Sequence, residues 1–175
     1  MSEPATLEER TSAVLATMAQ VTRILGREPP TRQTLLAVRR ALETLAARLD
    51  LFGEEAVPLP RRGSASAART AVYEEPGGRL SLSLTALDPG TETRPHAHGT
   101  WAAIAAIEGK AVNRLYHQGP RGLELLDVVV LGPGHGLALM PEDIHAVSVP
   151  GPGPARLLQL YGLALGRAPR RDEIR

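Results

Sequence analysis

Two histidines separated by one residue, His96 and His98, are the side chains whose type and spacing point most directly to chemistry. On an extended strand, residues i and i+2 project from the same face, so both imidazoles can reach one ion. His145 lies well downstream, after segments that we expect to form further hairpins, and a barrel can return such a strand beside the first. We therefore predict that the three histidines hold one divalent metal, since neutral imidazole suits iron, nickel, copper and zinc.

An isolated His-x-His pair is a weak signal, because most such pairs are surface or hydrogen-bonded histidines. The chain has five histidines, and the other two, His117 and His135, are expected on the surface at hairpin ends. Cysteine is absent, so any metal must be held by nitrogen and oxygen ligands.

The first third of the chain, about residues 5–53, predicts a helical hairpin. Thr6 and Glu9 form a capping box before apolar residues that recur at helical spacing as far as Gly26. Prolines 29 and 30 break the chain, and Thr31 then offers a second N-cap. We expect the second helix to end near 50–53.

From about residue 66 to 166, short apolar runs alternate with Gly and Pro turns, which predicts an antiparallel sandwich or barrel. Residues 79–87 alternate as a strand with one buried face should. Residues 167–175 form a charged tail, and we interpret 1–175 as a single domain.

The net charge and the lack of long apolar runs limit the partners and the cellular location that we expect for this protein. The 20 basic and 19 acidic side chains give no excess that would favour nucleic acid. No apolar run is long enough for a membrane span, and the N-terminus does not resemble a signal peptide, so we expect a cytoplasmic protein. Exposed strand edges would allow either a monomer or a homodimer.

The pattern Gly90-x5-His96-x-His98-x3-Ala102-x6-Gly109 resembles the first motif of the cupin superfamily, with Ala102 where those proteins usually have a ligating glutamate. A ligand set of three histidines without that glutamate resembles that of the thiol dioxygenases, the group that contains cysteine dioxygenase and 3-mercaptopropionate dioxygenase. Other stretches similar to that group are His98-Gly99-Thr100-Trp101, Ile107-Glu108-Gly109, Asp143-Ile144-His145 and Leu160-Tyr161-Gly162. The resemblance implies an all-β fold, a cupin jelly-roll barrel preceded by the N-terminal helical hairpin.

The same resemblance implies a function. Fe(II), held by the three histidines, would serve the oxidation of a small thiol carboxylate to a sulfinate with O2; zinc or nickel would fit the same ligands. Tyr161 matches the active-site tyrosine of the group, unless it only packs in its strand. Arg69 falls near the position that holds the substrate carboxylate, with Thr70 the alternative if the register slips by one, or it is a solvated arginine.

Two positions leave the role of their side chains open. The thiol dioxygenases usually have Ser-x-His-x-Tyr where this chain has Leu157, Gln159 and Tyr161, so a hydrogen-bonded relay is at best partial, although Gln159 could orient Tyr161. Trp101 either walls the pocket as a substrate-binding residue or fills the core. The alternatives to a thiol dioxygenase are a non-enzymatic metal-binding cupin and a cupin enzyme of different chemistry, such as an isomerase or an oxygenase that cleaves carbon–carbon bonds.

Overall fold

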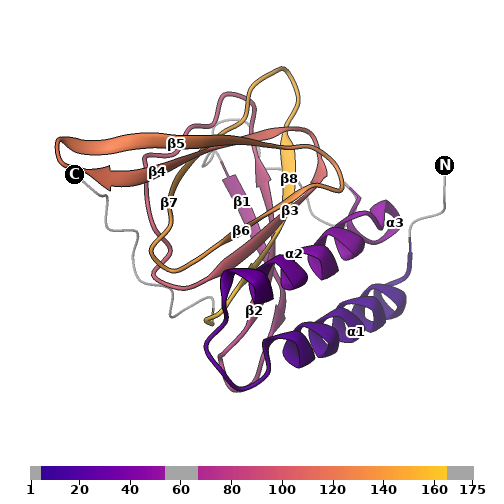
Figure 1. Ribbon diagram of the computed structural model, residues 1–175. Coiled ribbons are helices and arrows are strands. Elements are labelled where there is room, and N and C mark those ends of the chain that lie inside the picture. The colour runs from indigo at the N-terminus through magenta and orange to yellow at the C-terminus, as the bar shows by residue number, and fades with distance from the viewer. Residues whose placement is uncertain (1–4, 54–66, 165–175) are drawn as a thin grey trace.

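The computed structural model describes residues 5–53 and 67–164 (Figure 1). Its helices and strands, in chain order, are α1 (Leu7–Leu25), α2 (Arg32–Ala46), α3 (Leu49–Phe52), β1 (Ala67–Glu74), β2 (Ser81–Leu87), β3 (Ala102–Glu108), β4 (Ala111–Gly119), β5 (Gly122–Leu131), β6 (Gly136–Leu139), β7 (Ile144–Ser148) and β8 (Ala155–Tyr161). Within the described ranges, no helix is both long and apolar enough to cross a membrane.

Both expected helix starts are confirmed. The Thr6 hydroxyl accepts from the Glu9 N–H, and the Glu9 carboxylate accepts from the Thr6 N–H at 2.8 Å, which completes the capping box of α1. At α2 the Thr31 hydroxyl accepts from the Thr34 N–H at 3.1 Å, without a reciprocal bond from a glutamate. The two helices lie side by side as a hairpin (Figure 1).

The end of the second helix differs from the prediction. α2 stops at Ala46 and a separate short helix, α3, follows, because Arg48 adopts a non-helical conformation with φ −80° and ψ 77°. An unbroken helix would keep Leu49 on the buried face. The break leaves Leu49 52% exposed and buries Leu51 and Phe52 instead.

The strands form two antiparallel sheets. One has five strands in the order β1-β2-β8-β3-β6, and the other has three in the order β5-β4-β7. One apolar cluster joins α1, α2 and α3 to β2, β3 and β8 of the large sheet. A second lies between the sheets, with residues from strands of both. The helices thus cover the outer face of the large sheet and the small sheet covers its inner face (Figure 1).

This layering corrects one expectation. The strand predicted over 79–87 was expected to bury one face, but every residue of β2 is buried. Leu82 and Leu84 pack beneath the helices, whereas Ser83 and Thr85 lie on the opposite face, toward the small sheet. The alternation is real, but both faces of β2 are covered: the helices cover the apolar face, and the face that carries Ser83 and Thr85 is buried on the side of the small sheet.

The expected mostly-β fold preceded by helices is confirmed. No ladder between described strands closes the two sheets into one barrel, so a closed jelly-roll barrel stays a prediction. The interpretation of 1–175 as a single domain also stays a prediction, and the tail 167–175 lies outside the described residues.

One ion pair ties the helical layer to the turn before β7. The Arg32 guanidinium donates to both carboxylate oxygens of Asp143, at 2.9 and 2.7 Å, and the Met140 N–H donates to the same carboxylate at 2.8 Å. Burial would raise the pKa of the Asp143 carboxyl. The hydrogen bonds from Arg32 and Met140 outweigh burial and hold this pKa below its ordinary value.

We expect Asp143→Asn to lower the free energy of unfolding by about 1 kcal/mol, because it removes a bidentate, partly exposed ion pair. Since folding lowers the pKa of Asp143, its stabilisation is present above the ordinary value of 3.8 and is lost as the pH falls below that value. Urea unfolding at pH 7 and at low pH should therefore show a difference between wild type and variant that shrinks on acidification. An equal difference at both pH values would contradict this account.

Candidate metal centre

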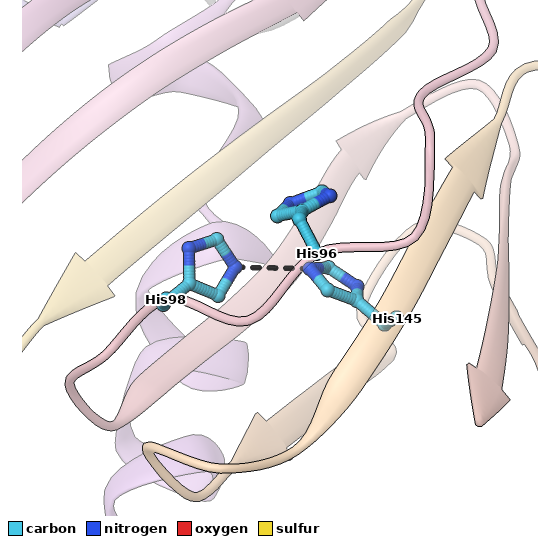
Figure 2. Close-up of side chains that lie close together, drawn as sticks. All are labelled: His96, His98 and His145. Carbon is cyan, nitrogen blue, oxygen red and sulfur yellow. Dashed lines mark hydrogen bonds between the residues drawn. The ribbon is translucent and has the colours of Figure 1, made fainter. Parts of the chain in front are cut away.

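His96, His98 and His145 converge from two chain segments (Figure 2). Each offers one ring nitrogen, and these nitrogens lie within 4.8 Å of one another. His96 and His145 are buried and His98 is partly buried. Within residues 5–53 and 67–164, no other set of three histidine or carboxylate side chains is gathered in this way.

The backbone that positions these histidines differs in part from the prediction. His96 and His145 form an isolated antiparallel bridge, in which each N–H donates to the other residue's carbonyl at 2.9 Å. His145 belongs to β7, but His98 lies in the loop that leads to β3, so the pair is not on a regular strand. The segment makes isolated bridges at Glu92 and His96, and Gly99 turns the chain with φ +65° directly after His98.

Hydrogen bonds to the outer ring nitrogens set the protonation of two histidines. A carbonyl oxygen only accepts, so His96 Nδ1 donates to the Arg94 carbonyl at 2.8 Å. His145 Nδ1 in turn donates to the Asn113 amide oxygen at 3.1 Å. Both neutral rings then carry their lone pair on Nε2.

The donor set fits a divalent metal of the first transition series. His98 Nε2 and His145 Nε2 lie 2.9 Å apart, which is close to the spacing of two nitrogens that share one ion at about 2.0–2.1 Å (Figure 2). Outer-nitrogen hydrogen bonds of the kind seen at His96 and His145 are the usual support of metal-ligating imidazoles. Three neutral nitrogens leave the charge of the ion uncompensated, which favours an anionic ligand beside it.

The histidines open into a pocket of about 450 Å³ between the two sheets. Its lining is mixed, with two cationic, one acidic and three hydroxyl-bearing side chains around the histidines; it comprises Ala67, Arg69, Thr85, Leu87, Thr91, Glu92, Thr93, Arg94, Pro95, His96, His98, His145, Val147 and Gln159. A cavity of this size and polarity suits a small polar molecule.

Arg69 and Gln159, two residues that sequence reasoning placed at the site, both line this pocket. The Arg69 Nε–H donates to the Ser83 hydroxyl at 2.9 Å, and its guanidinium carbon lies 5.0 Å from the centre of the Tyr161 ring. The Gln159 amide oxygen accepts from the Thr85 hydroxyl at 2.9 Å. Because the oxygen faces Thr85, the amide nitrogen of Gln159, a hydrogen-bond donor, faces the opposite direction.

Tyr161 and Trp101 occupy different places. Tyr161 is 6% exposed, and the centre of its ring lies 5.1 Å from that of the His98 ring. Trp101 packs in the cluster beneath the helices, where its indole lies against Gly162. Neither Trp101 nor Tyr161 is among the residues that line the pocket. Tyr161 therefore contacts the histidine cluster, whereas Trp101 lies on the helical side of the large sheet. His117 and His135 are exposed, as expected.

Three polar residues of this region escaped the sequence analysis, namely Asn113, Ser83 and Thr85. Each is buried and has apolar residues on both sides or on one side of it along its strand, in Ala111-Val112-Asn113-Arg114-Leu115 and in Leu82-Ser83-Leu84-Thr85-Ala86. A buried polar side chain on a strand needs a hydrogen-bond partner, and polar residues at buried strand positions were the signal that could have identified these three.

No protein-family model matches the chain, and no curated protein matches it. A structure of oxalate oxidase in complex with the substrate analogue glycolate matches over 65% of this chain and 59% of that chain, with a TM-score of 0.51 and 18% sequence identity. A Cupin_2 domain of an XRE family transcriptional regulator from Enterobacter cloacae matches over 60% of this chain and 99% of that chain, with a TM-score of 0.42 and 17% identity. The protein TT1209 from Thermus thermophilus matches over 61% of this chain and 91% of that chain, with a TM-score of 0.48 and 26% identity.

The structural neighbours of this chain are cupin-fold proteins. Of these three neighbours, only the oxalate oxidase structure has a TM-score above 0.5. At 18% sequence identity, this similarity concerns the fold alone. This chain spans about three fifths of that oxidase. Between its sheets, this protein holds a three-histidine cluster that fits a metal ion.

Proposed function

We propose that this cupin is an Fe(II)-dependent thiol dioxygenase, which oxidises the sulfur of a small thiol carboxylate to a sulfinate. One thiol and one O2 would give one sulfinic acid, with both oxygen atoms ending on sulfur. The observation that carries the proposal is the convergence of three histidines, with no carboxylate ligand among them, in a pocket that also contains Arg69. The resemblance in sequence to cysteine dioxygenase and 3-mercaptopropionate dioxygenase supports the same reading.

The position of the missing carboxylate supports an all-nitrogen ligand set. Ala102, where cupins usually have a ligating glutamate, is fully buried at the start of β3, and its methyl group has no donor atom. When bound, Fe(II) would supply the one-electron chemistry that O2 needs to react with a thiolate. Zinc or nickel would suit the same nitrogens, so the metal present in purified protein does not by itself identify the functional one.

The protein's own side chains would bind and orient the substrate. The Arg69 guanidinium, steadied by Ser83 and by the Tyr161 ring, would hold the substrate carboxylate through its remaining N–H groups. The Gln159 amide nitrogen, turned by Thr85, would add a second donor. Tyr161, packed beside His98, would place its hydroxyl near the reacting groups and donate or accept a proton there.

One observation favours a different chemistry in the same pocket. Gln159 stands where the thiol dioxygenases have a histidine, and its amide oxygen is engaged with Thr85. An amide does not titrate near neutrality, so a proton relay through this position is absent. Oxidation of a small carboxylic acid, the class of substrate that the name of oxalate oxidase denotes, would need the same carboxylate-binding donors without that relay.

The test is O2 uptake by protein loaded anaerobically with Fe(II), with cysteine, 3-mercaptopropionate, cysteamine and mercaptosuccinate as substrates. We expect uptake matched one to one by sulfinate with a thiol that carries a carboxylate, and less with cysteamine, which has none. Protein that binds one iron per chain but consumes no O2 with any of these thiols would overturn the dioxygenase proposal. Uptake with oxalate or glycolate instead would favour the second chemistry.

We expect Tyr161→Phe to slow turnover by roughly 10- to 100-fold while leaving metal affinity unchanged. The variant keeps the ring that contacts His98 and Arg69 and removes only the hydroxyl. Steady-state O2 uptake and metal titration of the same preparations measure the two quantities. Unchanged turnover would reduce Tyr161 to a packing residue.

A further inference from the structure

Asn113 is the sole asparagine of the sequence, and it lies on the inner face of β4 in an apolar setting. Its neighbours across the two ladders are Val129 of β5 and Val147 of β7, both of which belong to or pack on the core between the sheets. The residue is 1% exposed. Burying an amide there costs free energy unless both its oxygen and its nitrogen find partners.

The amide meets only half of that requirement. Its oxygen accepts from His145 Nδ1 at 3.1 Å, but its nitrogen is buried without a hydrogen-bond partner among the described residues. A group whose role was to stabilise the fold would be expected to satisfy both atoms. Leaving one buried donor unsatisfied costs about 1–3 kcal/mol, so an apolar side chain of similar size would serve the core at least as well.

The bond acts on the proton of His145. A neutral imidazole carries one proton, and the Asn113 oxygen retains it on Nδ1, which leaves the Nε2 lone pair for the metal. Without an acceptor at Nδ1, the ring can take the other tautomer. Its Nε2–H would then donate to His98 Nε2, 2.9 Å away, and both nitrogens would be lost as ligands.

We propose that Asn113 is a positioning residue of the metal centre: it holds His145 in the ligating tautomer at the expense of the stability of the metal-free protein. The inference rests on the metal site of the proposed function, but not on the identity of the substrate or of the reaction. It predicts that removing the amide separates metal affinity from stability.

The test compares Asn113→Leu, which removes the acceptor but keeps the branching and the number of side-chain heavy atoms, with Asn113→Asp, which keeps the acceptor. We expect the leucine variant to bind Co(II), titrated against a competing chelator, roughly 10- to 100-fold more weakly, the range typical of lost partners of ligating histidines. Its thermal midpoint without metal should equal or exceed that of the wild type. The aspartate variant should bind within a few-fold of the wild type or more tightly.

A second measurement needs no metal. Long-range ¹H–¹⁵N correlation spectra distinguish the two tautomers of a neutral imidazole. We expect His145 of the metal-free wild type to carry its proton on Nδ1 and that of the leucine variant to carry it on Nε2. An unchanged tautomer would overturn the inference, whatever the state of the metal titration.

The matched control is Val129→Ala, which loosens the same layer of the core across from Asn113 without touching His145. It should lower the thermal midpoint and leave Co(II) affinity and the His145 tautomer unchanged. If both variants lost affinity in proportion to their loss of stability, Asn113 would be an ordinary packing residue. If the wild type failed to bind Co(II) while its tautomer was as expected, the metal site and the proposed function would fall, and Asn113 would only fix the ring of His145.

Discussion

Replacing His145 with alanine should abolish stoichiometric metal binding and leave a folded protein. The side chain supplies one of three nitrogens, and two neutral histidines seldom retain a divalent ion against water. Because losing only a hydrogen-bond partner of a ligand already costs roughly 10- to 100-fold in affinity, losing the ligand itself should cost more than about 100-fold.

The fold should survive because the backbone of His145 makes contacts that do not depend on its ring. Its N–H and carbonyl pair with those of His96, and its main chain pairs with Leu115 of β4. Alanine keeps all of these. Anaerobic titration with Fe(II) or Co(II), together with circular dichroism, measures the two outcomes.

His135→Ala is the control for this experiment, because His135 is exposed in the turn before β6 and its ring bonds locally, to the Pro133 carbonyl at 3.2 Å. It should bind metal like the wild type. If His145→Ala also bound one ion per chain with wild-type affinity, the three-histidine centre would have to be abandoned, and with it the iron dependence of the proposed reaction.

Sequence patterns that span a few residues identified the helices and strands of this protein, but they did not predict how its layers pack on one another. Thr6 with Glu9, and Thr31, determine helix starts through contacts that span three residues, so they are readable from sequence. Whether β2 buries one face or two depends on the helices on one side of it and the small sheet on the other, both of which come from distant parts of the chain. Alternation along β2 therefore gave the correct strand and the wrong environment.

The same distinction applies at the site. The ligand histidines were found because their spacing and chemistry are local, even though the backbone at His98 turned out to be a loop. Asn113 was missed because its role depends on a diagonal contact with His145, from β4 to β7, and this contact depends on the register of those strands. Trp101 follows the ligand pair in sequence, yet it lies on the helical side of the sheet.

Gly109→Ala should be among the most destabilising single changes in the chain, lowering the free energy of unfolding by about 2 to 4 kcal/mol. Gly109 lies in the turn from β3 to β4 and has φ +72°, a conformation that costs an alanine roughly 1–2 kcal/mol. A Cβ added there would also overlap the Pro154 carbonyl oxygen and lie 2.9 Å from the Ala155 Cα. Both neighbours are backbone atoms at the start of β8, so relief requires moving the strand that carries Gln159 and Tyr161.

Gly134→Ala separates the two causes, because Gly134 has a similar φ of +78° but nothing within 4 Å of an added Cβ. It should cost only the conformational part, about 1–2 kcal/mol. Chemical unfolding of the two variants at one pH gives the difference directly. A larger loss at Gly109 would explain physically why a glycine occurs at this position of the cupin-like motif, namely the close approach of the β3–β4 turn to β8. Equal losses of unfolding free energy would mean that the backbone at Pro154 moves to accommodate the added methyl group. Glycine would then be needed at position 109 only for its positive φ.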